Sequence, residues 1–423
     1  MIVIMKHLHE GHLYWPETMK PQQPAVYPQL AEAITTDVAI IGGGMSGAIC
    51  GYILSRSGLT TALFERGQIG SGSSLANTGL LQYCNDIMLC DLADQIGEGA
   101  AVQFYKGCKQ AVEQLGELAA ELGTSSEFAS RSSLYFASTE QDVPRLKREY
   151  KLLKQHQFEV EYLEPEEIAA RFSFRKPGAI VTHGDASVNP SRFVHSLIDS
   201  AAKRFGLAVF EQTELSTAKR SNPGNRDSSR GWHILKSSTG YEVRAKHVIY
   251  AVGYEPEELR GKLVKSVMNR TYAIVTSPQP ELYEMFSRYL FWETARPYSY
   301  MRFLEDKRMI AGGGDDESKV LLTSESALRK ESEKVLGFIE GLFPTIQASI
   351  DYEWNATFAL SRDELPFIGA DPHTPGIYYC LGYGGNGTVY SMMGSHILHH
   401  LITGRDHPLA SIVALDRASL LKV

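Results

Sequence analysis

The spacing of apolar side chains predicts one long helix and two alternating strands. From Ala101 to Leu122 the apolar positions lie three or four residues apart, as in an amphipathic helix, and Gly123 is suited to end it. Residues 267–276 and 298–311 instead alternate between apolar and polar side chains, as strands of a half-buried sheet do. We therefore expect a sheet in the second half of the chain.

Shorter patterns and turn residues predict the other elements. We expect helices over 142–156, 164–172, 190–205, 324–342 and 388–403, and strands over 131–137, 206–211, 231–236, 242–251 and 377–381. The polar segment 219–230 is predicted to be an exposed hairpin loop, and His183 and Asp185 are placed in a glycine-containing turn. Residues 1–36, rich in proline and aromatic side chains, are expected to form an extended arm on the body of the protein.

One apolar run leads into a glycine-rich turn. Residues 38–41 predict a buried parallel strand. Gly42 and Gly44 allow a tight turn and a close approach of the backbone to a pyrophosphate. Gly47 lets the next helix, expected over 45–57, pack against the strand.

The residues around this turn supply polar contacts. Met45 and Ser46 begin the helix, where free N–H groups and the positive end of the helix dipole favour phosphate. A second strand over 60–64 leads to Glu65, whose carboxylate can accept hydrogen bonds from ribose hydroxyls. Strand, glycines, helix, strand and acid at this spacing predict a dinucleotide site. The small-residue loop 70–80 follows and is suited to contact phosphates and a ring system.

Composition narrows the class of protein. The 423 residues carry a net charge of −7, which argues against nucleic acid or an anionic membrane as the main partner. The five cysteines form no C-x-x-C pair, and no apolar run is long enough to span a membrane. The first residues lack the pattern of a signal peptide, so we expect a cytoplasmic protein. His396 and His400 have a metal-like spacing without an evident third ligand, and no metal is expected.

Several motifs together resemble one family. The glycine turn at 42–47, the loop 70–80, the strand 248–253 and the C-terminal segments 366–369 and 382–387 occur in the order seen in the D-amino-acid oxidase-like FAD-dependent oxidoreductases. That group includes glycine oxidase, sarcosine oxidase and γ-glutamylputrescine oxidase. The resemblance covers residues 35–405, and the arm with residues 300–302 is most similar to the γ-glutamylputrescine oxidase branch.

The resemblance implies an α/β fold with a Rossmann-like FAD-binding domain and a second α+β substrate domain built on an antiparallel sheet. The FAD-binding domain is expected over 37–85, 157–258 and 352–423, and the substrate domain over 86–156 and 259–351, after the arm 1–36. The residues that the motifs assign to FAD are Gly42, Gly44, Met45, Ser46, Gly47, Glu65, Arg66, Ser73, Ser74, Asn77, Thr78, Gly79, Leu80, Leu215, Ala251, Gly253, Gly384, Gly385, Asn386, Gly387 and Thr388.

Two of these assignments carry a specific role. By the resemblance, Leu215 provides backbone contacts to adenine, and the C-terminal glycine turn directs N–H groups at the pyrimidine edge of the flavin. The helix beginning after Gly387 also points its positive end there, which would stabilise a reduced, anionic flavin. Some relatives attach FAD covalently, but residues 352–362 contain no cysteine and Ala76 occupies the histidine position. A dissociable FAD is therefore expected.

The reaction implied is transfer of a hydride from the carbon next to an amine to the flavin, giving an imine that water hydrolyses. For a small amine or amino-acid substrate, Tyr300 and Arg302 share one face of a strand, and Arg302 is a candidate clamp for a carboxylate. Tyr272 is a further candidate, and Trp292 and Tyr298 are candidates for lining the pocket. The electron acceptor, O2 or another molecule, and the oligomeric state stay open.

Three alternatives remain at this point. A dehydrogenase of the same fold would act on a 2-hydroxy acid and pass electrons to a carrier. An NAD-dependent enzyme is disfavoured by the C-terminal glycine motif and by the lack of a second nucleotide fingerprint. A catalytically silent flavin-binding protein would hold FAD and oxidise no amine.

Overall fold

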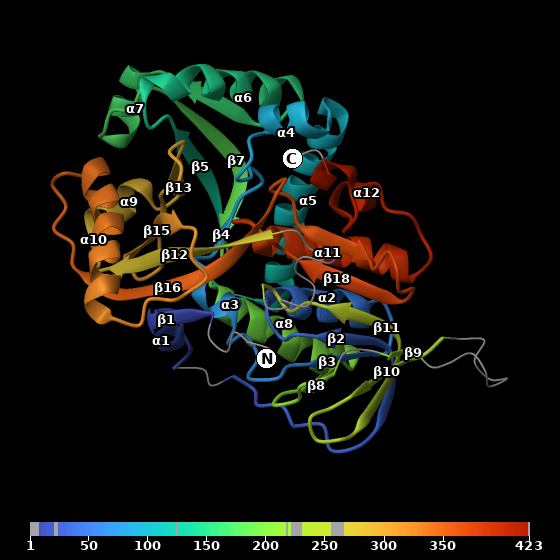
Figure 1. Ribbon diagram of the computed structural model, residues 1–423. Coiled ribbons are helices and arrows are strands. Elements are labelled where there is room, and N and C mark those ends of the chain that lie inside the picture. The colour runs from blue at the N-terminus through green and yellow to red at the C-terminus, as the bar shows by residue number, and fades with distance from the viewer. Residues whose placement is uncertain are drawn as a thin grey trace.

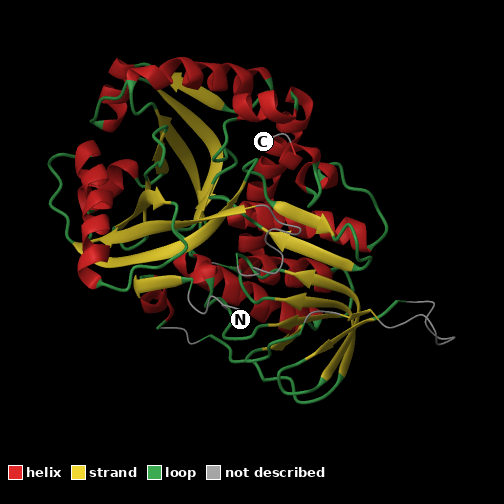
Figure 2. Cartoon of the chain, viewed as in Figure 1, coloured by secondary structure: helices red, strands yellow, loops and turns green. Residues whose placement is uncertain are grey.

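Residues 8–20, 24–123, 126–216, 219–220, 231–254 and 266–421 are described in a computed structural model of the chain. Their strands lie in two sheets, with helices on the outer faces and between the sheets (Figures 1 and 2). Of the predicted loop 219–230, residues 221–230 lie outside the described part.

The eight-stranded sheet is the nucleotide-binding type that the glycine motif predicts. Its order is β17-β18-β11-β2-β3-β8, with β10 on β11 and β9 on β10, and the central pairs β18-β11-β2-β3-β8 are parallel. The strands are β2 (Ile34–Ile41), β3 (Thr61–Phe64), β8 (Ala208–Phe210), β9 (Lys219–Arg220), β10 (His233–Lys236), β11 (Glu242–Tyr250), β17 (Phe367–Ala370) and β18 (Ile377–Leu381). The apolar run 38–41 lies in β2, at the centre, where Val38, Ala39 and Ile40 are fully buried.

The ten-stranded sheet is antiparallel except where β13 pairs with β5. Its order is β1-β16-β12-β15-β14-β13-β5-β7-β4, and β6 pairs with β7. The strands are β1 (His9–His12), β4 (Leu80–Leu81), β5 (Ala129–Phe136), β6 (Val160–Leu163), β7 (Ala179–Ser187), β12 (Ser266–Thr276), β13 (Tyr289–Glu293), β14 (Tyr300–Phe303), β15 (Met309–Asp316) and β16 (Ile350–Ser361).

Helices cover both sheets (Figure 1). α2 packs against α8 and α11, and α10 packs against β12, β15 and β16. The helices are α1 (Trp15–Met19), α2 (Met45–Arg56), α3 (Ser73–Ala76), α4 (Leu89–Ile96), α5 (Glu98–Leu122), α6 (Val143–Gln155), α7 (Pro165–Phe172), α8 (Pro190–Phe205), α9 (Pro280–Phe286), α10 (Glu325–Leu342), α11 (Gly387–Ile402) and α12 (Ala410–Val413). Among the described helices, none is long and apolar enough to cross a membrane.

The predicted long helix is α5, but two local predictions are wrong and one strand was not predicted. The single strand expected over 298–311 is a hairpin, because a turn around Lys307 separates β14 from β15. His183 and Asp185 lie within β7 and not in a turn, although the pairing of β7 with β5 shifts register beside Asp185. The twelve-residue strand β16 was not anticipated, because its sequence mixes charged and apolar residues without strict alternation.

The described part of the arm packs on the body as expected. β1 adds a strand to the edge of the ten-stranded sheet by pairing with β16, and Trp15 is fully buried. Because α1 interrupts the arm, it is not extended throughout.

The sheets divide the chain at other points than the predicted domain boundaries. β4, β6, β7 and β16 lie in segments assigned to the FAD-binding domain, yet their backbone groups pair within the ten-stranded sheet. We therefore propose a division in which the eight-stranded sheet belongs to the FAD-binding domain and the ten-stranded sheet to the substrate domain.

Candidate active site

The glycine turn forms a cradle with no room for side chains. Gly42 has a φ of +108°, and a Cβ there would lie 2.4 Å from the carbonyl oxygen of Ala251. A Cβ on Gly47 would lie 1.9 Å from the carbonyl oxygen of Gly42. The N–H of Met45, at the start of α2, donates to Ser74 Oγ over 2.8 Å, which brings the loop 70–80 to the helix N-terminus. The turn, the helix start and this loop are thus close together, as a pyrophosphate site requires.

Glu65 lies at the end of β3, beside the glycine turn. Its Oε2 accepts from Gly43 N over 2.7 Å and its Oε1 accepts from Gly67 N over 2.8 Å. The carbonyl oxygen of Glu65 accepts from Thr213 N, and Leu215 forms an isolated bridge with Ser237 just beyond. Glu65, the neighbouring exposed Arg66 and Leu215 therefore belong to one region, where adenine and ribose are expected.

The C-terminal glycine turn contacts the residues that follow the loop 70–80. Gly384 has a φ of +96°, and Asn386 donates to the carbonyl oxygen of Cys84 over 3.0 Å. Thr388, in the first turn of α11, is 3% exposed, and its Oγ1 has no hydrogen-bond partner among the described residues. A cradle that excludes Cβ atoms, two helix N-termini and an unpartnered buried hydroxyl fit FAD. The predicted positions Ala251 and Gly253 adjoin this cradle, since Gly253 lies beside Ser73.

Three side chains hold the loop 70–80 from behind. Trp354 Nε1 donates to the Ala76 carbonyl oxygen over 3.1 Å, Trp15 Nε1 donates to that of Asn77 over 2.7 Å, and Arg302 Nε donates to that of Thr78 over 2.9 Å. Each donor fixes one of three consecutive peptide groups. The sequence motif alone did not predict this backing, because Trp15 and Trp354 are far from the loop along the chain.

The structure corrects the role expected for Arg302. Tyr300 and Arg302 do share a face of β14, but the peptide of Thr78 and Gly79 lies between Arg302 and the cavity, so Arg302 does not line it. Its Nη2 donates to the Val188 carbonyl oxygen over 2.9 Å, and its guanidinium lies 5.7 Å from the ring centre of Trp15. Burial lowers the pKa of Arg302 to about 9. The guanidinium therefore acts as a main-chain donor and not as a carboxylate clamp.

Tyr272 is also outside the cavity. Its phenol donates to Asp316 Oδ2 over 2.7 Å on the opposite face of β12, and the preceding residue, Thr271, lines the cavity instead. The reason is the alternation of side chains along a strand.

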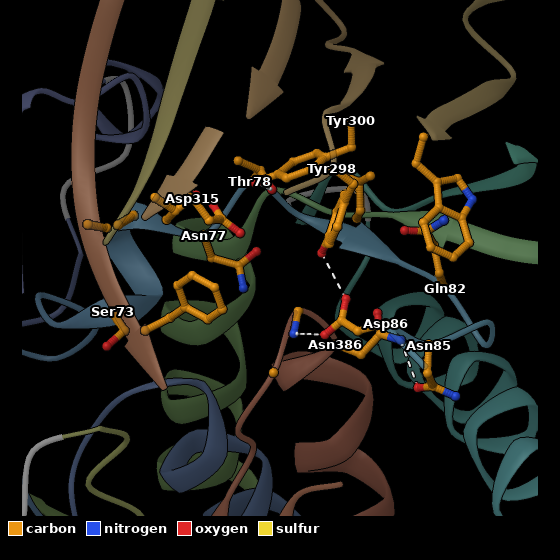
Figure 3. A pocket seen from close by; sticks show the side chains of 18 of the residues that line it. Ser73, Asn77, Thr78, Gln82, Asn85, Asp86, Tyr298, Tyr300, Asp315 and Asn386 are labelled. Carbon is orange, nitrogen blue, oxygen red and sulfur yellow. Dashed lines mark hydrogen bonds between the residues drawn. The ribbon is translucent and has the colours of Figure 1, made fainter. Parts of the chain in front are cut away.

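A cavity, partly open to solvent, lies between the segments 73–86 and 384–386 and the ten-stranded sheet (Figure 3). Trp292, Tyr298 and Tyr300 line it as expected, and so do Ser73, Asn77, Thr78, Leu80, Gly384, Gly385 and Asn386. The other lining residues are Ala76, Gln82, Cys84, Asn85, Asp86, Tyr254, Thr271, Asp315, Ala356, Thr357 and Phe358.

Asp86 links the two sides of this cavity. Its Oδ1 accepts from the Tyr298 hydroxyl over 2.8 Å, and its Oδ2 accepts from Gly385 N over 2.7 Å (Figure 3). The Gly385 N–H, expected to face the flavin, is thus already paired with a carboxylate of the chain. Burial raises the pKa of Tyr298 and raises that of Tyr300 to about 12, so both phenols stay protonated.

Asp315 is the second carboxylate of the cavity. It is half-buried, and its Oδ1 is shielded from solvent without a hydrogen-bond partner among the described residues. Burial raises the pKa of Asp315 to about 6, and nearby Asp86 and Asp316 also raise it. The sequence reasoning missed Asp86 and Asp315. For Asp315, the three glycines that separate it from the end of the expected strand 298–311 were an available signal.

The described residues that line the cavity include no Lys, Arg or His. Arg296 is close by, and its Nη2 donates to the carbonyl oxygen of Asp86 over 2.8 Å. Among the described residues there is also no group of three His, Cys, Asp or Glu that could hold a metal ion. His400 is one of the two histidines with metal-like spacing, and its Nδ1 donates a hydrogen bond to the carbonyl oxygen of His396.

Comparison with known proteins places the chain. The sequence profile of the DAO family, FAD dependent oxidoreductase, matches residues 37–401. A putative Rieske 2Fe-2S iron-sulfur protein from Bacillus subtilis (strain 168) is 21% identical over 403 residues, covering 93% of this chain and 74% of that protein. Gamma-glutamylputrescine oxidoreductase from Escherichia coli (strain K12) is 23% identical over 400 residues, 90% of this chain and 86% of that protein.

A solved structure has the same fold. Glycine oxidase from Geobacillus kaustophilus superposes with a TM-score of 0.75 at 21% identity, over 90% of this chain and 99% of that chain. The profile match spans most of the chain and includes the glycine turn, Glu65 and the C-terminal glycine turn. This chain therefore belongs to the DAO family of FAD-dependent oxidoreductases.

Proposed function

We propose that this flavoenzyme oxidises an amine at the carbon next to nitrogen. The observation that carries the proposal is the charge of the cavity: Asp86 and Asp315 line it, and no cationic side chain among the described lining residues does. A cationic or neutral amine suits such a site, whereas the carboxylate of a 2-hydroxy acid would meet two like charges.

The net reaction is R–CH2–NH2 + H2O + acceptor → R–CHO + NH3 + reduced acceptor. FAD, when bound, supplies the chemistry by taking the hydride and its electron pair from the C–H bond. The residues of the chain orient the amine and exclude water. Tyr298, fixed by Asp86, and Tyr300, whose hydroxyl lies 3.4 Å from that of Thr78, form an aromatic surface against which a substrate carbon can pack.

The amine has to be neutral to lose a hydride, so the reaction should speed up as pH rises toward the pKa of the amine. No described group is required as a base. The electron acceptor, O2 or another molecule, is not specified by these residues.

A matched set of four-carbon compounds tests the proposal. Purified holoenzyme is mixed anaerobically with 1-aminobutane, 2-aminobutanoate or 2-hydroxybutanoate, and the flavin band at about 450 nm is followed. We expect 1-aminobutane to bleach the flavin and release ammonia, and 2-hydroxybutanoate to leave it oxidised. Bleaching by the hydroxy acid alone would support the 2-hydroxy acid alternative. FAD that no amine reduces at any pH from 7 to 10 would support the silent flavin-binding alternative.

The cofactor is expected to be dissociable. Cys84 lines the cavity, but burial raises the pKa of its thiol well above the ordinary value, so the reactive thiolate is disfavoured. Acid precipitation should release all flavin into the supernatant. Flavin that stays with the polypeptide would contradict this expectation.

A further inference from the structure

The two carboxylates of the cavity differ in how far their hydrogen bonds are satisfied. Asp86 accepts from a phenol and from a backbone N–H, one on each oxygen. Asp315 has one oxygen, Oδ1, that is shielded from solvent and without a partner among the described residues. The Asp315 carboxylate lines the cavity and is less fully hydrogen-bonded than that of Asp86, so it is the better placed of the two to gain a donor from a ligand.

The position of Asp315 follows from its strand. Gly313 has a φ of +140°, and the pairing of β12 with β15 shifts register between Arg270 and Tyr272. This irregularity turns Asp316 toward Arg270 and Tyr272 on one face. Asp315 is on the other face, where it lines the same cavity as Asp86, Tyr298 and Tyr300 (Figure 3).

We propose that Asp315 binds a second cationic group of the substrate, so that the preferred substrate is a diamine or a longer polyamine rather than a monoamine or an amino acid. This inference rests on the proposed function. A carboxylate stabilises the protonated form of a nearby amine, while the amine that reacts has to be neutral. Asp315 is therefore better suited to an ammonium group that is not oxidised.

The aromatic surroundings favour the same class of ligand. Tyr298 and Tyr300 have ring centres 5.8 Å apart, and Trp292 lies 6.2 Å from Tyr298. Ammonium groups are attracted to the faces of such rings, and the methylene chain between two nitrogens packs on them. An amino acid would instead place its carboxylate beside Asp315 or Asp86.

Binding is measured first, with probes that the enzyme cannot oxidise. 2,5-Dimethylhexane-2,5-diamine carries two ammonium groups and no C–H next to either nitrogen, and tert-butylamine is its single-charge counterpart. Perturbation of the oxidised flavin spectrum in holoenzyme should show the diamine binding at least tenfold more tightly. Asp315→Asn should remove this advantage, so that affinity for the diamine falls about ten- to a hundredfold, whereas affinity for tert-butylamine, which Asp86 also attracts, should fall by a much smaller factor.

The control is Asp316→Asn, which neutralises the adjacent carboxylate on the opposite face and should keep the diamine advantage. Asp315→Asn is expected to fold, because it keeps the size of the side chain and removes a partly buried charge, one oxygen of which has no hydrogen-bond donor among the described residues. Anaerobic bleaching by 1,4-diaminobutane against 1-aminobutane then reports whether the preference extends to the reaction.

The outcomes separate this inference from the proposed function. Equal affinity for the two probes, or an advantage that survives in Asp315→Asn, would overturn the second-cation site even if amines are oxidised. Tight, Asp315-dependent diamine binding without bleaching by any amine would support the site and contradict amine oxidation.

Discussion

The two walls of the cavity are built in different ways. The cofactor wall, residues 73–80 and 384–387, is formed largely by main chain and small side chains held close to α2 and α11. The substrate wall, Trp292, Tyr298, Tyr300 and Asp315, is formed by large or charged side chains of β13 to β15 and the hairpin between β13 and β14. The cofactor is thus expected to depend on backbone geometry that tolerates no added Cβ, whereas substrate preference depends on a few exchangeable side chains.

A methyl group added at Gly47, in the glycine turn beside the cofactor wall, should have the largest effect on FAD binding. Gly47→Ala places a Cβ 1.9 Å from the Gly42 carbonyl oxygen, so the turn has to shift. We expect FAD affinity to fall at least about a hundredfold, or about 3 kcal/mol. FAD titration of the apoprotein measures this.

The matched control is Gly337→Ala in α10, an exposed helical glycine with nothing within 4 Å of the added Cβ. It should leave FAD affinity unchanged and slightly stabilise the protein, by up to about 1 kcal/mol. Wild-type FAD affinity in Gly47→Ala would show that the cradle is not the pyrophosphate site.

Arg302 tests whether the region behind the cofactor wall is structural. Arg302→Met leaves the carbonyl oxygens of Thr78 and Val188 without their donor, and we expect a loss of about 2–5 kcal/mol in the free energy of unfolding. Arg302→Lys should recover part, since an ammonium cannot supply the planar fork. Denaturant unfolding of the three proteins gives the values.

The same variant distinguishes a scaffold from a substrate clamp. In the fraction that keeps FAD, 1-aminobutane and 2-aminobutanoate should lose efficiency by the same factor. Unchanged stability together with a selective loss of 2-aminobutanoate turnover would restore the carboxylate-clamp role that the sequence predicted.

Glu65 should have a smaller effect, confined to the cofactor. Glu65→Ala removes a charged acceptor from the expected ribose site and from Gly43 N and Gly67 N, and should weaken FAD by about ten- to a hundredfold. Turnover per bound flavin should stay near that of the wild type. Glu32→Ala, at an exposed position, serves as the control. If Glu65→Ala binds FAD as tightly as Glu32→Ala and the wild type do, Glu65 is not part of the FAD site.

The affinity of the substrate wall for a diamine should depend on pH through Asp315. Burial raises the pKa of Asp315 to about 6; Asp86 and Asp316 act in the same direction, and the Thr271 hydroxyl and Arg296 oppose it. Below that pH the carboxyl is protonated and cannot pair with a cation. Affinity for 2,5-dimethylhexane-2,5-diamine should therefore rise about tenfold between pH 5 and 7, since its ammonium groups stay protonated throughout. A rise that persists in Asp315→Asn would assign it to another group.

The local geometry of the glycine turn was easier to predict from the sequence than the placement of the substrate wall. Gly42, Gly47 and Glu65 belong to one strand–helix–strand unit, where short spacing fixes geometry, and the family assignment follows from it. Arg302 and Tyr272 were predicted to face the substrate but do not line the cavity. The pattern of a strand predicts on which side of the sheet a side chain lies, but not which other residues cover that side. Thr78 and Gly79 cover Arg302, and a register shift near Tyr272 decides which residues of β12 and β15 reach the cavity.

The most direct test of the account is a crystal structure of the holoenzyme with 2,5-dimethylhexane-2,5-diamine. FAD should lie along Gly42–Gly47 with its ring at the C-terminal glycine turn. One nitrogen of the diamine should lie within about 3.2 Å of an oxygen of the Asp315 carboxylate, while Arg302 stays behind Thr78. A diamine bound away from Asp315, or an Arg302 side chain turned into the cavity, would contradict the division of the site into a main-chain cofactor wall and an acidic substrate wall.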